Sequence, residues 1–294
     1  MTLNEAKSIF RMLSRDNLSD EDFFLYTEAG EFIIEATGDP RYMMELGGAY
    51  YDRRNFDLAL HYYEMAARAG FEPANTALGY IWYYGRTGKT DYEKAFRYFS
   101  ACPGSINARY KIADMYKNGY YVPRDEQKYI SIIETLYALV SQDTCPEDLQ
   151  PEIFTRLARI RINQGKKEEA LSLLRQAKKR LALRISENQF FGNLSIMKHL
   201  ILDMYSLTRV NEGEIDLFDL YEILRRPSRV SFRYAGRQHT VQSVAEDGRV
   251  VIQFDGGKWY RTTDDFFERA AIGDVHLTEI CLELTDFEVT AHGE

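Results

Sequence analysis

The sequence is poor in the side chains that build cross-links and metal sites. Its 294 residues include only three cysteines, Cys102, Cys145 and Cys281, which are widely spaced and form no Cys-x-x-Cys pair. This pattern argues against a disulfide framework and against a cysteine zinc site. The five histidines are scattered and form no His-x-x-x-His pair, so they offer no metal site either. We expect no cofactor and no metal.

Long apolar runs are also missing. No stretch approaches the ~20 apolar residues that cross a bilayer. Met1 to Arg15 contains an acidic residue, Glu5, and lacks the apolar core of a signal peptide. The chain is 45% hydrophobic with a mean hydropathy of -0.41, which is ordinary for a soluble protein. These properties predict a cytoplasmic protein without a membrane contact.

Enzyme motifs are absent as well. Residues Gly85 to Thr90 end in Gly-Lys-Thr, as a phosphate-binding loop does. That motif needs a glycine at the position of Tyr83, and it follows a strand, whereas this segment follows a predicted helix. The Gly-x-Ser-x-Gly elbow of hydrolases does not occur. The neighbouring acids Asp264 and Asp265 suit the start of a helix better than acid–base catalysis. We expect that the protein is not an enzyme.

What the sequence does contain is an internal repeat. The segments Leu46-Gly47-x-x-Tyr50, Leu78-Gly79-x-x-Trp82 and Ile112-Ala113-x-x-Tyr116 follow one another at intervals of 32 and 34 residues. Partner segments read Leu58-Ala59-x-x-x-Tyr63 and Lys94-Ala95-x-x-x-Phe99. A small residue beside a large one lets two antiparallel helices approach closely, and the aromatic fills the groove between pairs. The spacing predicts an α-α superhelical solenoid.

The loops between the helices repeat as well. An aromatic helix end meets Gly85 or Gly119, a short loop follows, and then Asp91 or Asp125 stands where the next helix begins. A glycine can adopt the left-handed conformation that ends a helix, and an aspartate can accept hydrogen bonds from the first N–H groups of the next one. The loops are therefore predicted to join packed helices.

These segments resemble Sel1-like repeats, which are relatives of the tetratricopeptide repeat. The resemblance rests on Tyr-x-x-Gly-x-x-Val-Pro-x-Asp at Tyr116 to Asp125, on Lys-Ala-x-x-Tyr-Phe at Lys94 to Phe99, and on Ala59 to Gly70. It covers residues 41–140, about a third of the chain. The first unit departs by having Asp52-Arg53-Arg54-Asn55 in place of the long loop, and the third by having Gln127-Lys128-Tyr129 in place of Lys-Ala.

A fourth unit is closer to a plain tetratricopeptide pair. Leu157-Ala158 is followed by the turn Gln164-Gly165 and by an amphipathic helix through Leu174. The interval from Ile112 is 45 residues because Ser141 to Pro151 inserts a linker with two prolines. A change of superhelical direction is expected there.

We predict three parts: 1–40 as N-terminal capping helices (Asn4 to Leu13 and Asp20 to Ala36), 41–226 as the helical repeat domain, and 227–294 as a small antiparallel β-rich module, SH3-like or similar. The repeat domain should end with helices over Asn188 to Leu207 and Glu214 to Arg225. In the β module, strands are expected around residues 230–234, 240–244, 250–254 and 258–261. A helix over Asp264 to Ala271, capped by Thr263 or Asp264, and a strand over Cys281 to Thr290 should follow.

Charge is unevenly distributed. Residues 1–40 carry nine acids and three bases, whereas Arg156 to Arg184 carries ten bases and two acids. One interpretation of the basic segment is a solvated or neutralised helix face, and the other is a site for an acidic partner or nucleic acid. The chain as a whole is acidic, with a net charge of -8, and this argues against nucleic-acid binding. The basic patch consists of Lys166, Lys167, Arg175, Lys178, Lys179 and Arg180.

The resemblance to tetratricopeptide pairs implies that the first helix of each unit lines a concave groove. The implied partner-binding residues are Arg41, Met44, Tyr51, Asp52, Thr76, Tyr80, Tyr83, Tyr84, Tyr110, Asp114, Lys117, Asn118, Thr155, Arg159 and Asn163. Such a groove is rich in tyrosine, which suits recognition of a peptide or helix. The alternative is that individual tyrosines only pack between repeats.

We therefore expect a non-enzymatic scaffold or adaptor that binds a protein or peptide partner in this groove. The alternative function is a nucleic-acid-associated regulatory protein that uses the basic residues 156–184 and the basic start of the β module.

Overall fold

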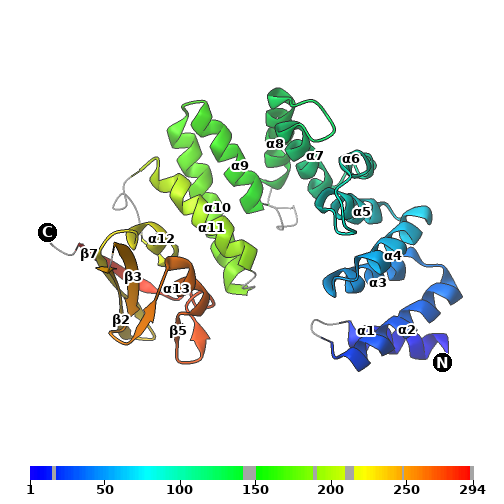
Figure 1. The fold of residues 1–294 in the computed structure, drawn as a ribbon, viewed down its shortest axis with the longest axis horizontal. Coiled ribbons are helices and arrows are strands. Elements are labelled where there is room, and N and C mark those ends of the chain that lie inside the picture. Colours follow the sequence, from blue (N-terminus) through cyan, green and yellow to red (C-terminus); the bar gives the residue numbers. More distant parts are fainter. Residues whose placement is uncertain (15–17, 142–149, 188–190, 209–214, 247, 292–294) are drawn as a thin grey trace. The chain divides into compact units, whose positions relative to one another are not determined.

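The fold is known from a computed structural model, which describes residues 1–14, 18–141, 150–187, 191–208, 215–246 and 248–291 (Figure 1). Two compact units make up the chain, Met1–Leu136 and Tyr137–Glu294. Cys145, most of the linker expected at Ser141 to Pro151, and the expected helix start at Asn188 lie outside the described residues. The domain boundaries after residues 40 and 226 stay predictions.

Unit 1 is built from antiparallel helix pairs (Figure 1). Its helices are α1 (Leu3–Leu13), α2 (Asp20–Thr37), α3 (Pro40–Asp52), α4 (Phe56–Arg68), α5 (Glu72–Tyr84), α6 (Tyr92–Ser100) and α7 (Ile106–Asn118); α8 (Glu126–Val140) follows, and the division between the units falls within it. α1 packs on α2, α3 on α4, and α5 on α6. The predicted helical repeats are confirmed.

The close approach of paired helices depends on glycine. A Cβ atom on Gly47 of α3 would lie 2.5 Å from ring atoms of Tyr63 on α4, and one on Gly79 of α5 would lie 2.4 Å from the ring of Phe99 on α6. Tyr63 and Phe99 are buried, so their rings have no free space to move into. The glycine and aromatic positions of the repeat therefore fit each other as predicted.

The two repeated loops end one helix and start the next. Gly85 and Gly119 are left-handed, with φ of 61° and 73°. The side chains of Asp91 and Asp125 accept hydrogen bonds at 2.9 Å from the N–H groups of Lys94 and Lys128. A Cβ on Gly85 would meet the backbone N of Thr90 at 2.7 Å. Their glycines and aspartates thus have structural roles, as expected from the repeat.

After the end of α8, unit 2 contains three helices that lie side by side, α9 (Gln150–Asn163), α10 (Lys167–Glu187) and α11 (Phe191–Tyr205) (Figure 1). The bounds predicted for the helix over Glu214 to Arg225 are wrong. The described part, from residue 215, forms only the 3-10 turn η1 (Leu217–Asp219) and the short α12 (Leu220–Ile223).

The shortened helix has a physical cause. Asp216 and Asp219 cap the turn reciprocally, and the fully buried carboxylate of Asp219 accepts two hydrogen bonds, each 2.8 Å, from the ammonium group of Lys178 on α10. Tyr205 on α11 donates to the same carboxylate at 2.9 Å. These bonds fix the turn against α10 and α11.

The rest of unit 2 is an antiparallel sheet in the order β4-β3-β2-β1-β7. Its strands are β1 (Ser228–Tyr234), β2 (Arg237–Glu246), β3 (Arg249–Phe254), β4 (Lys258–Tyr260) and β7 (Thr285–Ala291); β5 (Ala271–Ile272) and β6 (Val275–His276) form a separate hairpin. One sheet face carries Val230, Phe232, Val241, Ile252 and Phe254 into the core. The predicted β-rich module is confirmed.

Two details of the module differ from the prediction. Helix α13 (Thr263–Arg269) is capped by Thr262, whose hydroxyl accepts from the N–H of Asp265 at 3.0 Å, and not by Thr263 or Asp264. The last strand begins at Thr285, because the preceding turns bury Cys281, whose Sγ donates to the carbonyl of Ala182 at 3.6 Å.

Candidate functional site

A cluster of four tyrosines surrounds a lysine on the first helices of the second and third repeats. The ammonium group of Lys111 on α7 lies 5.0 to 5.7 Å from the ring centroids of Tyr80, Tyr83 and Tyr84 on α5 and of Tyr110 on α7. It donates a 2.7 Å hydrogen bond to the Tyr84 hydroxyl. We call Lys111 and these four residues the tyrosine cluster.

The charge inside the tyrosine cluster is balanced. Asp114, one turn along α7, places a carboxylate oxygen 3.7 Å from the Lys111 nitrogen, and the two side chains are only 11% and 8% exposed. Aromatic faces attract a cation, and this attraction grows when water is excluded. Lys111 therefore holds α5 and α7 together and fixes the ring of Tyr84.

The four tyrosines divide into packed and accessible rings. Burial raises the pKa of the Tyr80 and Tyr83 phenols, with smaller contributions from Tyr84 and Asp114. Tyr80 and Tyr83 both pack edge-on against Phe99. Tyr84, in contrast, is 45% exposed. The interpretation that tyrosines pack between repeats thus holds for part of the cluster, while Tyr84 faces solvent.

Arg86 continues the accessible surface beside Tyr84. Its Nε donates to the hydroxyl of Tyr51 on α3 at 3.0 Å, and its guanidinium carbon lies 5.2 Å from the Tyr84 ring centroid and 5.5 Å from that of Phe56. These contacts connect the first and second repeats. Arg86 and Tyr84 thus form one continuous cationic and aromatic surface.

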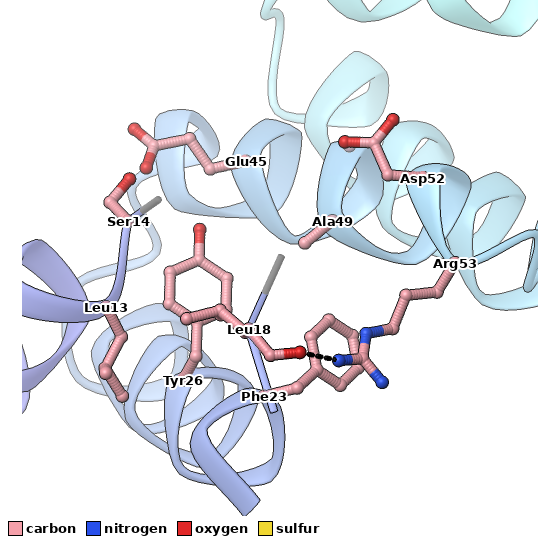
Figure 2. Close-up of a pocket in the computed structure, with 10 residues that line it drawn as sticks. Leu13, Ser14, Leu18, Phe23, Tyr26, Glu45, Ala49, Asp52 and Arg53 are labelled. Atoms are coloured by element: carbon pink, nitrogen blue, oxygen red, sulfur yellow. Dashed lines mark hydrogen bonds between the residues drawn. The ribbon is translucent and has the colours of Figure 1, made fainter. Parts of the chain in front are cut away.

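The first repeat contributes an open hollow of about 820 Å³ between α2 and α3. Figure 2 shows the carboxylates of Glu45 and Asp52 on α3 and the rings of Phe23 and Tyr26 on α2 around it. Arg53 closes one end, where its guanidinium donates to the carbonyl of Leu18 at 2.6 Å. Partial burial raises the pKa of Glu45. The hollow is acidic and aromatic, in contrast to the cationic surface of Arg86.

The other residues predicted for the groove have varied surroundings. Arg41 is exposed and pairs with Asp39 at 2.6 Å, whereas Met44 is partly buried and packs against the apolar cluster that contains Tyr63. Thr76 donates to Ser105 at 3.2 Å, and Lys117 lies over the ring of Tyr129. Asn118 is exposed and donates to the Asp114 carbonyl at 2.9 Å.

In unit 2, Thr155 is buried and donates to the Pro151 carbonyl. Arg159 pairs with Asp203 at 2.6 Å, and Asn163 is exposed. That these α9 residues share one groove with the tyrosine cluster stays a prediction.

Sequence reasoning missed Lys111 and Glu45, although the repeat register contains them. They stand immediately before the marker residues Ile112 and Leu46, and Ala77 precedes Leu78 in the same way. The prediction used positions two before and two, five and six after the markers, together with Arg41, and did not use the position directly before them. That row carries an acid, a small residue and a base in successive repeats.

The basic patch contains several neutralised charges. Lys178 is 8% exposed and bound to Asp216 and Asp219, so it does not belong to an accessible patch. Lys166 lies 3.7 Å from Glu169, and Arg180 lies over the ring of Phe154. The remaining members, Lys167, Arg175 and Lys179, are exposed.

Within the described ranges, no group of three His, Cys, Asp or Glu side chains could hold a metal ion. No helix in those ranges is both long and apolar enough to span a membrane.

The fold and this surface define an α-helical repeat solenoid that ends in a small β module. The Sel1 repeat family matches residues 38–71, 73–101 and 106–128, so this part of the chain carries three Sel1 repeats. A crystal structure of a Sel1 repeat protein from Oxalobacter formigenes is similar, with 16% identity, a TM-score of 0.54, and 75% of this chain and 84% of that chain covered. This likeness shows the fold.

A protective antigen of uropathogenic Escherichia coli with an SLR fold has 16% identity and a TM-score of 0.49, with 70% of this chain and 50% of that chain covered. A search of curated proteins gives no match.

Proposed function

We propose that the protein is a non-enzymatic scaffold that binds a protein partner on the accessible part of the repeat surface around Tyr84. Sel1 repeats generally mediate contacts between proteins, and solenoids present extended surfaces built from successive repeats. The observation that carries the proposal is the tyrosine cluster, where Lys111 holds Tyr84 in one orientation while leaving 45% of that residue exposed.

Fixed aromatic side chains favour binding because their conformational entropy is already lost. Tyrosine offers a large contact area with few rotatable bonds, and it is enriched among the residues that dominate binding energy. Arg86 is held by Tyr51 and by neighbouring rings and adds a planar donor next to Tyr84. A peptide or helix with an aromatic or aliphatic side chain and a nearby acceptor fits this surface.

The experiment compares partner capture by full-length variants in cells of the source organism. Tyr84→Ala combined with Asn118→Ala removes accessible side chains from the proposed surface. The matched control is Tyr121→Asn, which removes an exposed tyrosine from the loop after α7, where the backbone is left-handed (φ 64°) and asparagine is tolerated.

Loss of a dominant tyrosine costs about 2 kcal/mol or more, which is about 30-fold in affinity. We expect at least one protein that copurifies with the wild type and with the control to be lost from the double variant. Identical sets of copurifying proteins for all three, with unchanged circular dichroism, would refute the proposal.

The nucleic-acid alternative has less support, because Lys178 is buried and Lys166 is paired with Glu169. It predicts binding of labelled duplex or single strands that weakens steeply with salt. Absence of binding at low salt would eliminate it.

A further inference from the structure

The β module has an incompletely covered sheet edge. Strand β4 is the outermost strand, and its three residues pair only with Ile252–Phe254 of β3. The first half of β3, Arg249–Val251, pairs with β2 on one side. On its other side, no strand within the described residues lies against it. This half of β3 offers an edge to which an extended chain can add.

A hollow of about 560 Å³ opens beside this edge. Val244 and Val251 are opposite each other on β2 and β3, and Trp259 is opposite Gln253, two residues along from Val251. Side chains on one sheet face recur every second residue, so all three side chains lie on the same face. The lining consists of Val244, Ala245, Glu246, Val251, Trp259, Tyr260 and Arg261.

Trp259 is the unusual residue of this hollow. It is 53% exposed, whereas its neighbour Tyr260 is 4% exposed and packs edge-on against Phe266 on the core side. Edge strands that avoid pairing normally carry charges or proline and no large apolar side chain. An exposed tryptophan beside two valines therefore indicates an interaction surface.

The charges around the hollow are mainly positive. Arg249 and Arg261 are exposed at or beside the hollow on the sheet face of Val251 and Trp259, and Glu246 is the acid in the lining. Within the described residues, no ion pair involves the side chain of Arg249. An acidic ligand complements the charge of this edge. Because Val244 and Val251 line the hollow, the ligand must also carry an apolar side chain.

We propose that this edge binds an extended acidic segment of a partner protein, with an aliphatic side chain on Val244 and Val251 beside Trp259. Its carboxylates face Arg249 and Arg261, and its backbone lies along Arg249–Val251. A single strand of nucleic acid fits less well, because such sites stack successive bases on several aromatic rings and this hollow has one exposed ring. The site is separate from the tyrosine cluster and does not depend on it.

The two tryptophans allow a direct test. Trp82→Phe leaves Trp259 as the sole reporter in the full chain, and the change is mild because the buried Trp82 Nε1 has no hydrogen-bond acceptor among the described residues. The probe is the peptide acetyl-EVEVDVE-amide, titrated while Trp259 fluorescence is recorded. The controls are acetyl-KVKVKVK-amide, acetyl-ESESDSE-amide and a short oligothymidine.

We expect a saturable change in Trp259 emission with the acidic aliphatic peptide. The affinity should fall about threefold or more between low and physiological salt, because the charges are exposed to solvent. The basic peptide should produce no change, and the serine peptide should bind at least about tenfold more weakly because it cannot bury aliphatic surface.

Variants then locate the site. Arg249→Glu with Arg261→Glu should weaken binding about tenfold or more. The matched control, Arg229→Glu with Arg237→Glu, reverses two exposed charges on β1 and β2 and should leave the affinity within about twofold. The proposal is overturned by an unchanged emission, by equal binding of the basic peptide, by tighter binding of oligothymidine, or by equal effects of both charge reversals.

This test and the partner-capture experiment fail independently. Loss of peptide binding at Trp259 leaves the capture result at Tyr84 unaffected, because the charge reversals in the β module and the substitutions of Tyr84 and Asn118 lie in different units.

Discussion

Replacing Gly47 by alanine tests how the repeat brings its helices together. The new Cβ would lie 2.5 Å from two ring carbons of Tyr63 and 3.2 Å from a third. Tyr63 is buried, so the contact is relieved only by moving α3 away from α4 or by turning the ring. Overpacking of this kind costs about 1–3 kcal/mol, partly offset by the ~1 kcal/mol that alanine gains over glycine within a helix.

Gly48 is the matched control because it is the next residue of the same helix. A Cβ there meets only the Tyr63 hydroxyl, at the ordinary contact distance of 3.9 Å. Gly48→Ala should therefore stabilise the protein by up to about 1 kcal/mol. The two variants should differ by about 1–3 kcal/mol in the free energy of unfolding, although both make the same chemical change.

Urea unfolding followed by circular dichroism measures this difference, with each transition fitted separately since the chain has two compact units. Adding Tyr63→Leu to Gly47→Ala should recover part of the loss, because the clashing ring atoms are gone. Equal stability of the two alanine variants would refute the close-approach explanation of the repeat.

Three further predictions follow from buried groups. Lys178→Met leaves the Asp219 carboxylate buried without its cation and should destabilise unit 2 by about 3–5 kcal/mol in urea unfolding; a loss below about 1 kcal/mol would contradict this. Burial, with a contribution from Asp216, raises the pKa of the Cys281 thiol to about 12. Native Cys145→Ser protein should therefore react with a thiol reagent at pH 8 about 100-fold more slowly than the unfolded protein does. Fast labelling of the native protein would contradict this prediction. Burial also raises the pKa of several phenols, including Tyr80 and Tyr83. The unfolded phenols ionise near pH 10 while the folded ones stay protonated. The contribution of these phenols to stability should therefore be constant below about pH 10, and stability should fall above it; stability that rises there would show the sign to be wrong.

The sequence by itself determined the local features of this protein. Its helix ends depend on residues a few positions apart, such as Asp91 and the N–H of Lys94. The glycine and aromatic markers predicted the helix pairs because their spacing repeats along the chain, and Gly79 does lie against Phe99. Strands were predictable for the same reason, since apolar alternation and glycine turns are local patterns.

Only the tertiary structure decided which distant side chains meet. Lys111 contacts Tyr84 across 27 residues, and Lys178 contacts Asp219 across 41. Both lysines look alike in the sequence as helical bases, yet one fixes an accessible tyrosine and the other is buried in an ion cluster. Their roles depend on where the chain brings an aromatic ring or a carboxylate to them, because a charge loses its water only when packing supplies a partner.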